Sequence, residues 1–142
     1  MRTLNELIIH CSATREGQDF SAKDIDLWHR QRGFRMIGYH FVIRLDASIE
    51  LGRPVEDIGA HTRGHNANSI GICYIGGLDA KGQPKDTRTK AQKEALIDCV
   101  RRLLKAYPSI TKIAGHNEYA QKACPSFDVQ KDPLGGLIHE KT

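Results

Sequence analysis

Apolar and polar positions along the chain follow two periods, one typical of strands and one typical of helices. Residues 7–11 are almost continuously apolar, which is typical of a strand that is covered on both faces. Residues 39–45 alternate between apolar and polar side chains, so they predict a second strand with Tyr39 on one face and His40 on the other. The same reasoning predicts three further short strands, at residues 49–53, 69–75 and 112–115.

Two segments combine amphipathic spacing with a helix start signal. Ser21 and Asp24 form a capping-box pattern at the start of the first helix. Thr89 and Gln92 form another, before a longer helix over about residues 90–106. Because strands and helices alternate, with hairpin elements among them, the sequence predicts the α/β class. We expect a single domain with a mixed central β-sheet flanked by helices on both faces.

Length and composition exclude several classes of protein. The chain has 142 residues, enough for one domain over residues 1–142 but not comfortably for two. Gly135 and Gly136 predict a loosely ordered tail from about residue 131. No apolar run approaches the roughly 20 residues that span a bilayer, and the first residues lack the apolar core of a secretory signal peptide. We therefore expect a protein that is made in the cytoplasm and is not inserted in a membrane.

The charge of the chain is mildly positive. Its 21 basic and 17 acidic residues give a net charge of +4. The basic residues are scattered and form no block of the kind that marks a nucleic-acid-binding tail. We therefore expect no nucleic-acid partner, and we take the chain as a monomer.

The four cysteines fall into two groups. Cys11, Cys73 and Cys99 lie inside apolar periodic segments, where a reduced thiol behaves as a small hydrophobic side chain. Cys124 lies in an irregular segment that gives it no periodic packing partner. This difference makes Cys124 the candidate for chemistry.

Three residues with metal-binding side chains lie at or near strand ends. His10 closes the first strand, His116 follows the last strand, and Cys124 lies eight residues further on. Two imidazoles and one thiolate suit Zn²⁺ and leave one coordination position open for water, as in catalytic zinc sites. Each residue alone is more often a hydrogen-bonded core or surface residue. The separation of His10 from His116 means that only the fold can bring the three together.

A second histidine pair offers a rival metal site. His61 and His65 are four residues apart, a spacing that places two side chains on one face of a helix. The polar segment between them contains Gly64, however, and predicts a loop. We interpret His61 as a cleft residue that contacts substrate and His65 as a loop or rim residue. Asn66 and Asn68 either hydrogen-bond the substrate or shape turns.

Four other residues have simpler interpretations. His29 and His139 are expected at the surface, and His40 is expected to have a structural role opposite Tyr39. Asp128 either orients a ligand histidine from the second shell or caps the next turn, and we favour the first.

Five short motifs occur in order along the chain: HCSAT at 10–14, GYHF at 38–41, NSIGI at 68–72, GHN at 115–117 and KACPSFD at 122–128. Together they resemble the zinc N-acetylmuramoyl-L-alanine amidases, the family that includes T-odd phage lysozyme and the peptidoglycan recognition proteins. The resemblance extends over about residues 5–130, nearly the whole chain.

The resemblance implies an endolysin-like hydrolase with peptidoglycan as its partner. Such an enzyme cuts the amide bond between the lactyl group of N-acetylmuramic acid and L-alanine of the stem peptide. By position, the resemblance assigns His10, His116 and Cys124 as ligands of one Zn²⁺ per chain, and Tyr39 and Lys122 as catalytic residues. The alternative is a recognition domain that binds peptidoglycan without cleaving it. The presence of Cys124 favours the enzyme, because some relatives that lack this cysteine have lost catalysis.

The chemistry of amide hydrolysis is consistent with these residue types. Zinc lowers the pKa of bound water toward about 7 and polarises the amide carbonyl. Lys122 can place its ammonium group near the developing oxyanion, and Tyr39 can hydrogen-bond the attacking water. Ordinary pKa values of about 10 make both residues poor general bases at neutral pH. The identity of the proton donor to the leaving amine stays open. Two settings also stay open: action on the cell wall after release, or action on imported wall fragments.

Overall fold

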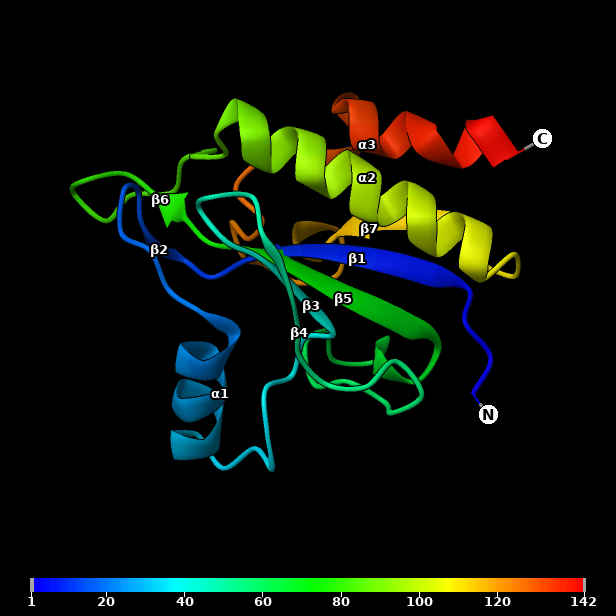
Figure 1. Cartoon of the computed structure of the whole chain (residues 1–142), viewed down its shortest axis with the longest axis horizontal. Coiled ribbons are helices and arrows are strands. Elements are labelled where there is room, and N and C mark those ends of the chain that lie inside the picture. The colour runs from blue at the N-terminus through cyan, green and yellow to red at the C-terminus, as the bar shows by residue number, and fades with distance from the viewer. Residues whose placement is uncertain (1, 142) are drawn as a thin grey trace.

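A five-stranded sheet with the strand order β4-β3-β5-β1-β7 forms the centre of the computed structural model, which describes residues 2–141 (Figure 1). Its strands are β1 (Glu6–Cys11), β3 (Phe41–Ile43), β4 (Ile49–Leu51), β5 (Ser69–Tyr74) and β7 (Lys112–Gly115). Strand β4 is antiparallel to β3, and the other neighbouring strands are parallel. The sheet is therefore mixed, as predicted. A separate two-stranded sheet pairs β2 (Thr14–Arg15) with β6 (Gly77–Leu78).

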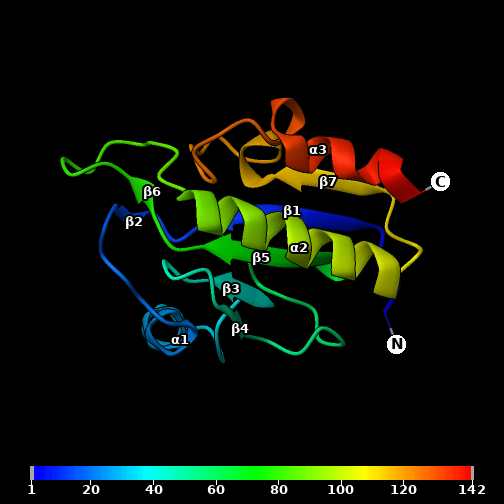
Figure 2. The ribbon, with the colours of Figure 1, turned by 45° about the horizontal axis from the view of Figure 1, so that its top comes forward.

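Helices cover both faces of the sheet, which confirms the predicted architecture (Figure 2). They are α1 (Ala22–Gln31), α2 (Lys90–Ala106) and the short α3 (Pro133–Gly136). Both predicted capping boxes are present, one at Ser21 and one at Thr89. Within the described residues, no helix has the length and apolar character needed to cross a membrane.

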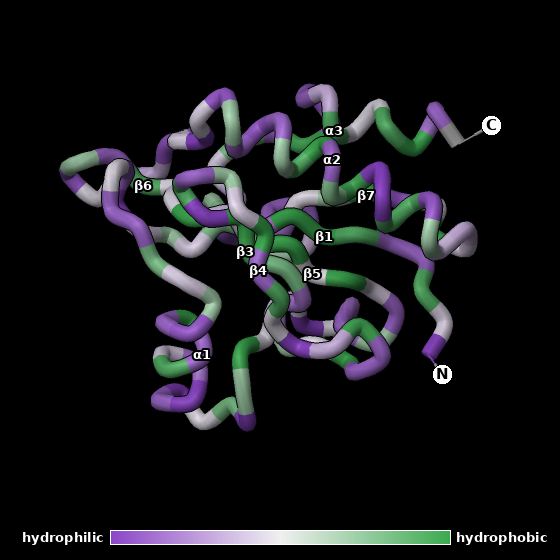
Figure 3. The backbone as a smooth tube through the Cα atoms, in the orientation of Figure 1, coloured by the Kyte–Doolittle hydropathy of each residue, from purple (hydrophilic) through white to green (hydrophobic). Residues whose placement is uncertain are grey.

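The alternation of side chains along the strands divides the core into two clusters. Ile9 packs with Leu103 of α2 on one face, and Val42 packs with Ile25 of α1 on the other. Figure 3 shows that the most hydrophobic segments gather in the strands at the centre of the fold. Because successive residues of a strand point to opposite faces, His10 lies on the α1 side. The side chain of His10 is fully buried there.

The register of the sheet explains why residues distant in sequence come close together. Ile9 of β1 pairs with Gly115 of β7, and the two strands are parallel. The next residues along the chain, His10 and His116, therefore meet at the carboxyl edge of the sheet. Functional groups of α/β folds gather at this edge.

Strand β3 is shorter than the predicted strand over residues 39–45, since it begins only at Phe41. Tyr39 packs on the α1 side of the sheet, not on the face of Phe41 as the alternation predicted. The backbone bends before the strand, where the Gly38 N–H donates to Nδ1 of His29 at 2.9 Å. The expectation that His29 lies at the surface is wrong for the same reason, because this contact buries its ring.

The C-terminal segment is also better ordered than its glycines suggested. It forms α3 and two 3-10 helices, η3 (Val129–Lys131) and η4 (Leu137–Lys141). Leu134 and Leu137 are buried in the cluster beneath α2. The prediction of a loose tail from about residue 131 is therefore wrong, because two leucines anchor the segment. His139 is exposed, as expected.

The cysteines follow the sequence prediction. Cys11, Cys73 and Cys99 are buried, and each is a free thiol. Cys124 is also free but only partly buried. Its sulfur lies in the region where the sheet presents His10 and His116.

Candidate metal centre and active site

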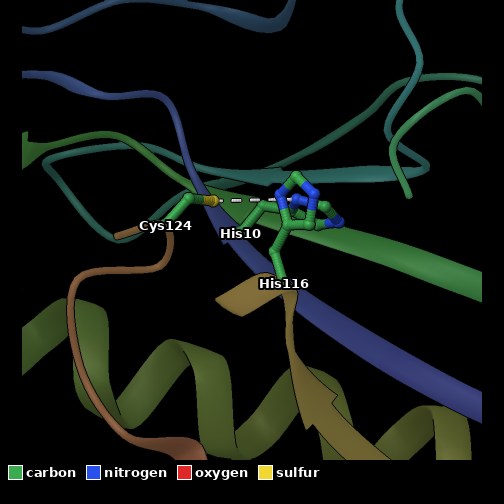
Figure 4. Close-up of side chains that lie close together, drawn as sticks. All are labelled: His10, His116 and Cys124. Carbon is green, nitrogen blue, oxygen red and sulfur yellow. Dashed lines mark hydrogen bonds between the residues drawn. The ribbon is translucent and has the colours of Figure 1, made fainter. Parts of the chain in front are cut away.

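Three side chains from distant parts of the chain converge at the carboxyl edge of the sheet (Figure 4). His10 belongs to β1, His116 begins the 3-10 helix η2 (His116–Glu118) directly after β7, and Cys124 lies in the following loop. One ligand atom from each residue can be chosen so that all three lie within 4.8 Å of one another. Sγ of Cys124 is 3.8 Å from Nδ1 of His10, and the two imidazole centroids are 4.6 Å apart.

This donor set fits a zinc ion. Zinc–sulfur and zinc–nitrogen bonds at a tetrahedral angle place the two donor atoms about 3.6 Å apart. The separation of 3.8 Å between Cys124 and His10 is close to that value. Burial, together with the neighbouring histidines and Lys122, lowers the pKa of His10 well below its ordinary value of 6.5. Burial and Lys122 also lower the pKa of His116, so both imidazoles are neutral at pH 7, the state that binds metal.

Backbone and side-chain contacts orient the proposed ligands. The Cys11 N–H donates to Sγ of Cys124 at 3.2 Å and so fixes the position of the sulfur. Nε2 of His10 lies 2.8 Å from Nδ1 of His61 and 3.2 Å from the hydroxyl of Thr62. These contacts occupy one ring nitrogen of His10 and leave Nδ1 directed at Cys124. An outer partner of this kind fixes the tautomer of a metal-binding histidine.

A cleft of about 480 Å³ opens beside the three residues. It is lined by His29, Arg32, Phe34, Tyr39, Ala60, His61, Thr62, Arg63, Asn66, His116, Tyr119, Ala120 and Lys122. A smaller hollow of about 240 Å³ adjoins it and also reaches Cys124. Tyr39, His116 and Lys122 line both spaces. The converging ligands therefore lie where a bound molecule would meet Tyr39 and Lys122.

The protonation state of Tyr39 suits it to donate a hydrogen bond and not to act as a base. Its ring centroid lies 5.0 Å from that of His10. Burial, followed by the nearby cysteines, raises the pKa of Tyr39 well above its ordinary value of 10. The phenol is therefore protonated at neutral pH. Lys122 is exposed at the mouth of the cleft, two residues before Cys124.

The predicted substrate-contacting residues lie in different places. His61 lines the cleft, but its Nε2 contacts Ser69 Oγ at 3.3 Å and its Nδ1 contacts His10. Asn66 also lines the cleft, where its Oδ1 accepts the backbone N–H groups of His61 and Thr62, both at 2.9 Å. It thereby shapes the loop, one of the two roles left open for it.

Asn68 is not among the residues that line the cleft. Its side-chain amide instead donates to the carbonyl of Thr3 at 2.8 Å. The prediction that Asn68 contacts substrate is therefore not supported by its position. This contact ties Asn68 to the N-terminal segment and does not test the turn-forming role, which the sequence left as the alternative.

Other residues have structural roles. Nδ1 of His40 accepts the Gly71 N–H at 3.0 Å, as its expected structural role required. Asp128 accepts the Gln130 N–H at 2.9 Å and caps η3, so the favoured prediction that it orients a ligand histidine is wrong. His65 stacks on Tyr119 with a centroid distance of 3.7 Å and contacts Glu6 at 2.9 Å, behind the cleft wall.

Several cleft residues were not found from the sequence. Arg32, Phe34, Arg63 and Tyr119 line the cleft but lie in loops or at element ends. None of these residues belongs to a motif or a periodic pattern. Only the closeness of Arg63 to His61 in sequence offered a signal.

Comparison with known proteins agrees with the geometry of the site. The N-acetylmuramoyl-L-alanine amidase family matches residues 1–127. The endolysin of Enterobacteria phage K11 is 41% identical over 127 residues, which are 89% of this chain and 83% of the relative.

Solved structures show the same fold. The N-acetylmuramoyl-L-alanine amidase LysC from Clostridium intestinale superposes with a TM-score of 0.79 and 31% identity, covering 99% of this chain and 85% of LysC. Drosophila PGRP-LB gives a TM-score of 0.78 with 26% identity over 94% of this chain and 84% of its own. The five motifs, the converging side chains and these matches agree: the chain belongs to the N-acetylmuramoyl-L-alanine amidase family.

Proposed function

We propose that the chain is a zinc-dependent N-acetylmuramoyl-L-alanine amidase. It hydrolyses the amide bond between the lactyl group of N-acetylmuramic acid and L-alanine of the peptidoglycan stem peptide. The observation that carries this proposal is the convergence of His10, His116 and Cys124 beside the cleft. Because one relative is an endolysin, the proposal includes the place of action: the chain acts on the cell wall after its release.

His10, His116 and Cys124 would hold one Zn²⁺. Such an ion supplies a Lewis acid and makes a water molecule nucleophilic at neutral pH. The chain's own residues act around it. The protonated phenol of Tyr39 donates a hydrogen bond to the reacting groups, and the ammonium of Lys122 stabilises the negative charge that develops on the carbonyl oxygen.

Turnover of a defined muropeptide tests this proposal. Protein loaded with Zn²⁺ is expected to release a stem peptide with a new N-terminal L-alanine, identified by mass spectrometry. A strong chelator should stop the release, and added Zn²⁺ should restore it, because the three proposed ligands converge beside a cleft that His116 lines. Cleavage at another bond would refute the assigned reaction. Tight binding of the muropeptide without release would instead make the chain a recognition domain.

We propose that the main role of His61 is to position His10, and that contact with substrate is its lesser role. His61→Ala removes the ring nitrogen Nδ1 that lies 2.8 Å from Nε2 of His10. We expect zinc affinity to fall roughly 10- to 100-fold, as for other outer-shell partners of ligand histidines. Competition with a chromogenic chelator measures this directly. Asn68→Ala, at an exposed position outside the cleft, serves as the control. Unchanged zinc affinity in His61→Ala would contradict the positioning role.

A further inference from the structure

Glu6, at the start of β1, is a buried carboxylate that the proposed reaction does not use. Its exposed fraction is 6%, and among the residues that the structure describes it is the only acidic residue that is buried. A buried carboxylate costs free energy unless hydrogen bonds or a cation compensate for its burial. The hydroxyl of Tyr119 donates to Oε2 of Glu6 at 2.6 Å, and Nδ1 of His65 lies 2.9 Å from Oε1. The carboxylate therefore joins two segments that are distant in sequence.

The place of Glu6 on β1 keeps it away from the proposed ligands. Glu6 and His10 lie on the same face of the strand, because successive residues point to opposite faces. The four-residue separation places them about 13 Å apart along the strand. Glu6 is also not among the residues that line the cleft. The contacts through which it can act on the proposed metal centre are therefore those with His65 and Tyr119.

Tyr119 connects Glu6 with the proposed ligand His116. The Tyr119 N–H donates to the carbonyl of His116 at 3.0 Å and closes η2, the 3-10 helix that His116 begins. Burial, followed by the hydrogen bond to Glu6, raises the pKa of Tyr119 above its ordinary value of 10, so the hydroxyl keeps its proton and donates. Because Glu6 holds the Tyr119 side chain, it also restrains η2 relative to β1.

His65 connects Glu6 with the groups that contact His10. The His65 N–H donates to the carbonyl of Thr62 at 2.9 Å. The Thr62 hydroxyl lies 3.2 Å from Nε2 of His10, and Nδ1 of the neighbouring His61 lies 2.8 Å from it. A carboxylate accepts hydrogen bonds, so the contact with Glu6 places the proton of His65 on Nδ1.

The two partners of Glu6 also contact each other. The rings of His65 and Tyr119 stack with their centroids 3.7 Å apart and an angle of 18° between their planes. Glu6, His65 and Tyr119 therefore form a closed cluster in which each side chain contacts the other two. A polar network whose members are all hydrogen-bonded holds them in one arrangement. This cluster is attached to the backbone of His116 on one side and to that of Thr62 on the other.

We propose that Glu6 is a positioning residue for the proposed metal centre. Its carboxylate fixes η2, which carries His116, against the loop whose side chains orient His10. The inference rests on the proposed zinc-dependent function and adds to it a residue that touches neither metal nor substrate. Breaking the cluster is expected to weaken zinc binding although all three ligands remain.

Competition for Zn²⁺ with a chromogenic chelator tests this role without any turnover. We expect Glu6→Leu to lower zinc affinity about tenfold, and Tyr119→Phe, which removes only a hydroxyl, about threefold. The double variant should stay near the tenfold loss, because both substitutions remove the same contact. Glu6→Gln should recover most of the affinity. Its amide oxygen can accept from Tyr119, and its amide N–H can donate to the other tautomer of His65.

Glu50→Leu and Tyr107→Phe are the matched controls, because they remove the same groups at positions outside η2 and the cleft. Glu50 accepts the Ala22 N–H at 2.8 Å, so its replacement also removes a hydrogen bond. Both controls should keep the wild-type zinc affinity. Thermal unfolding in excess chelator shows whether each variant folds without metal. If Glu6→Leu does not fold, Tyr119→Phe still gives the decisive measurement.

Wild-type zinc affinity in the folded Glu6→Leu and Tyr119→Phe proteins would overturn the positioning role, even if their thermal stability falls. A Glu6→Gln protein that binds zinc as weakly as Glu6→Leu would also overturn it, because the hydrogen bonds would then not be the cause. Both outcomes leave the amidase function standing. A wild-type chain that binds no zinc would instead refute the proposed function together with this inference.

Discussion

Cys124→Ser is expected to abolish amide hydrolysis, with a loss of roughly 10³-fold or more in kcat/KM. Sγ of Cys124 lies 3.8 Å from Nδ1 of His10 and accepts the Cys11 N–H, a geometry suited to a sulfur ligand. A serine hydroxyl stays protonated at neutral pH and is a poor ligand for Zn²⁺. Elemental analysis of the purified variant should therefore show that zinc is lost together with activity.

Ala123→Ser is the control for this substitution, because it introduces the same hydroxyl one residue away at an exposed position. It should keep one zinc per chain and wild-type turnover. A Cys124→Ser protein that keeps both its zinc and its activity would show that the metal is held elsewhere. Comparing the thermal unfolding of both variants in the presence of a chelator separates loss of metal from loss of fold.

The proposed ligands could be predicted from the sequence because each occupies a strand end or a short motif. His10 and His116 follow or end apolar runs that periodicity identifies as strands. Parallel pairing of β1 with β7 then brings them together. That pairing is a long-range property, and the sequence supplied it only through the resemblance to a known family.

The errors of the sequence analysis have a common physical cause. Local polarity predicts an exposed His29 and glycine content predicts a loose C-terminal tail, but tertiary contacts decide both. The ring of His29 is buried by its contact with Gly38, and Leu134 is buried beneath α2. The sequence alone does not decide the role of Asp128 either. An aspartate can accept the N–H of Gln130 as a helix cap or contact a distant histidine, and both roles suit the same residue type.

The cleft itself was the part least accessible to the sequence. Its walls come from loops whose conformation depends on capping contacts, such as the acceptance of two backbone N–H groups by Asn66. Arg32 and Arg63 belong to no periodic pattern, and only the fold shows that both line the cleft. Specificity is therefore harder to predict from this chain than the metal centre.

Lys122→Ala is expected to lower kcat about 10²- to 10³-fold while zinc content and KM change little. The ammonium lies at the mouth of the cleft. Burial is the larger cause of the lowered pKa of His116, and the positive charge of Lys122 is the second. The electric field of Lys122 therefore reaches the proposed metal centre. Because negative charge grows on the carbonyl oxygen only as the amide is attacked, the loss should appear in kcat. Initial rates on a defined muropeptide, with zinc measured on the same samples, give both quantities.

Lys131→Ala removes the same charge at an exposed position on η3 outside the cleft, and it should leave kcat unchanged. Lys122→Arg keeps the charge and should recover part of the lost rate, which a purely structural role for the lysine would not explain. If Lys122→Ala raises KM and leaves kcat intact, Lys122 binds the ground state of the substrate. Transition-state stabilisation would then depend on Tyr39 and the metal. The split between kcat and KM thus separates transition-state stabilisation by Lys122 from substrate binding by Lys122.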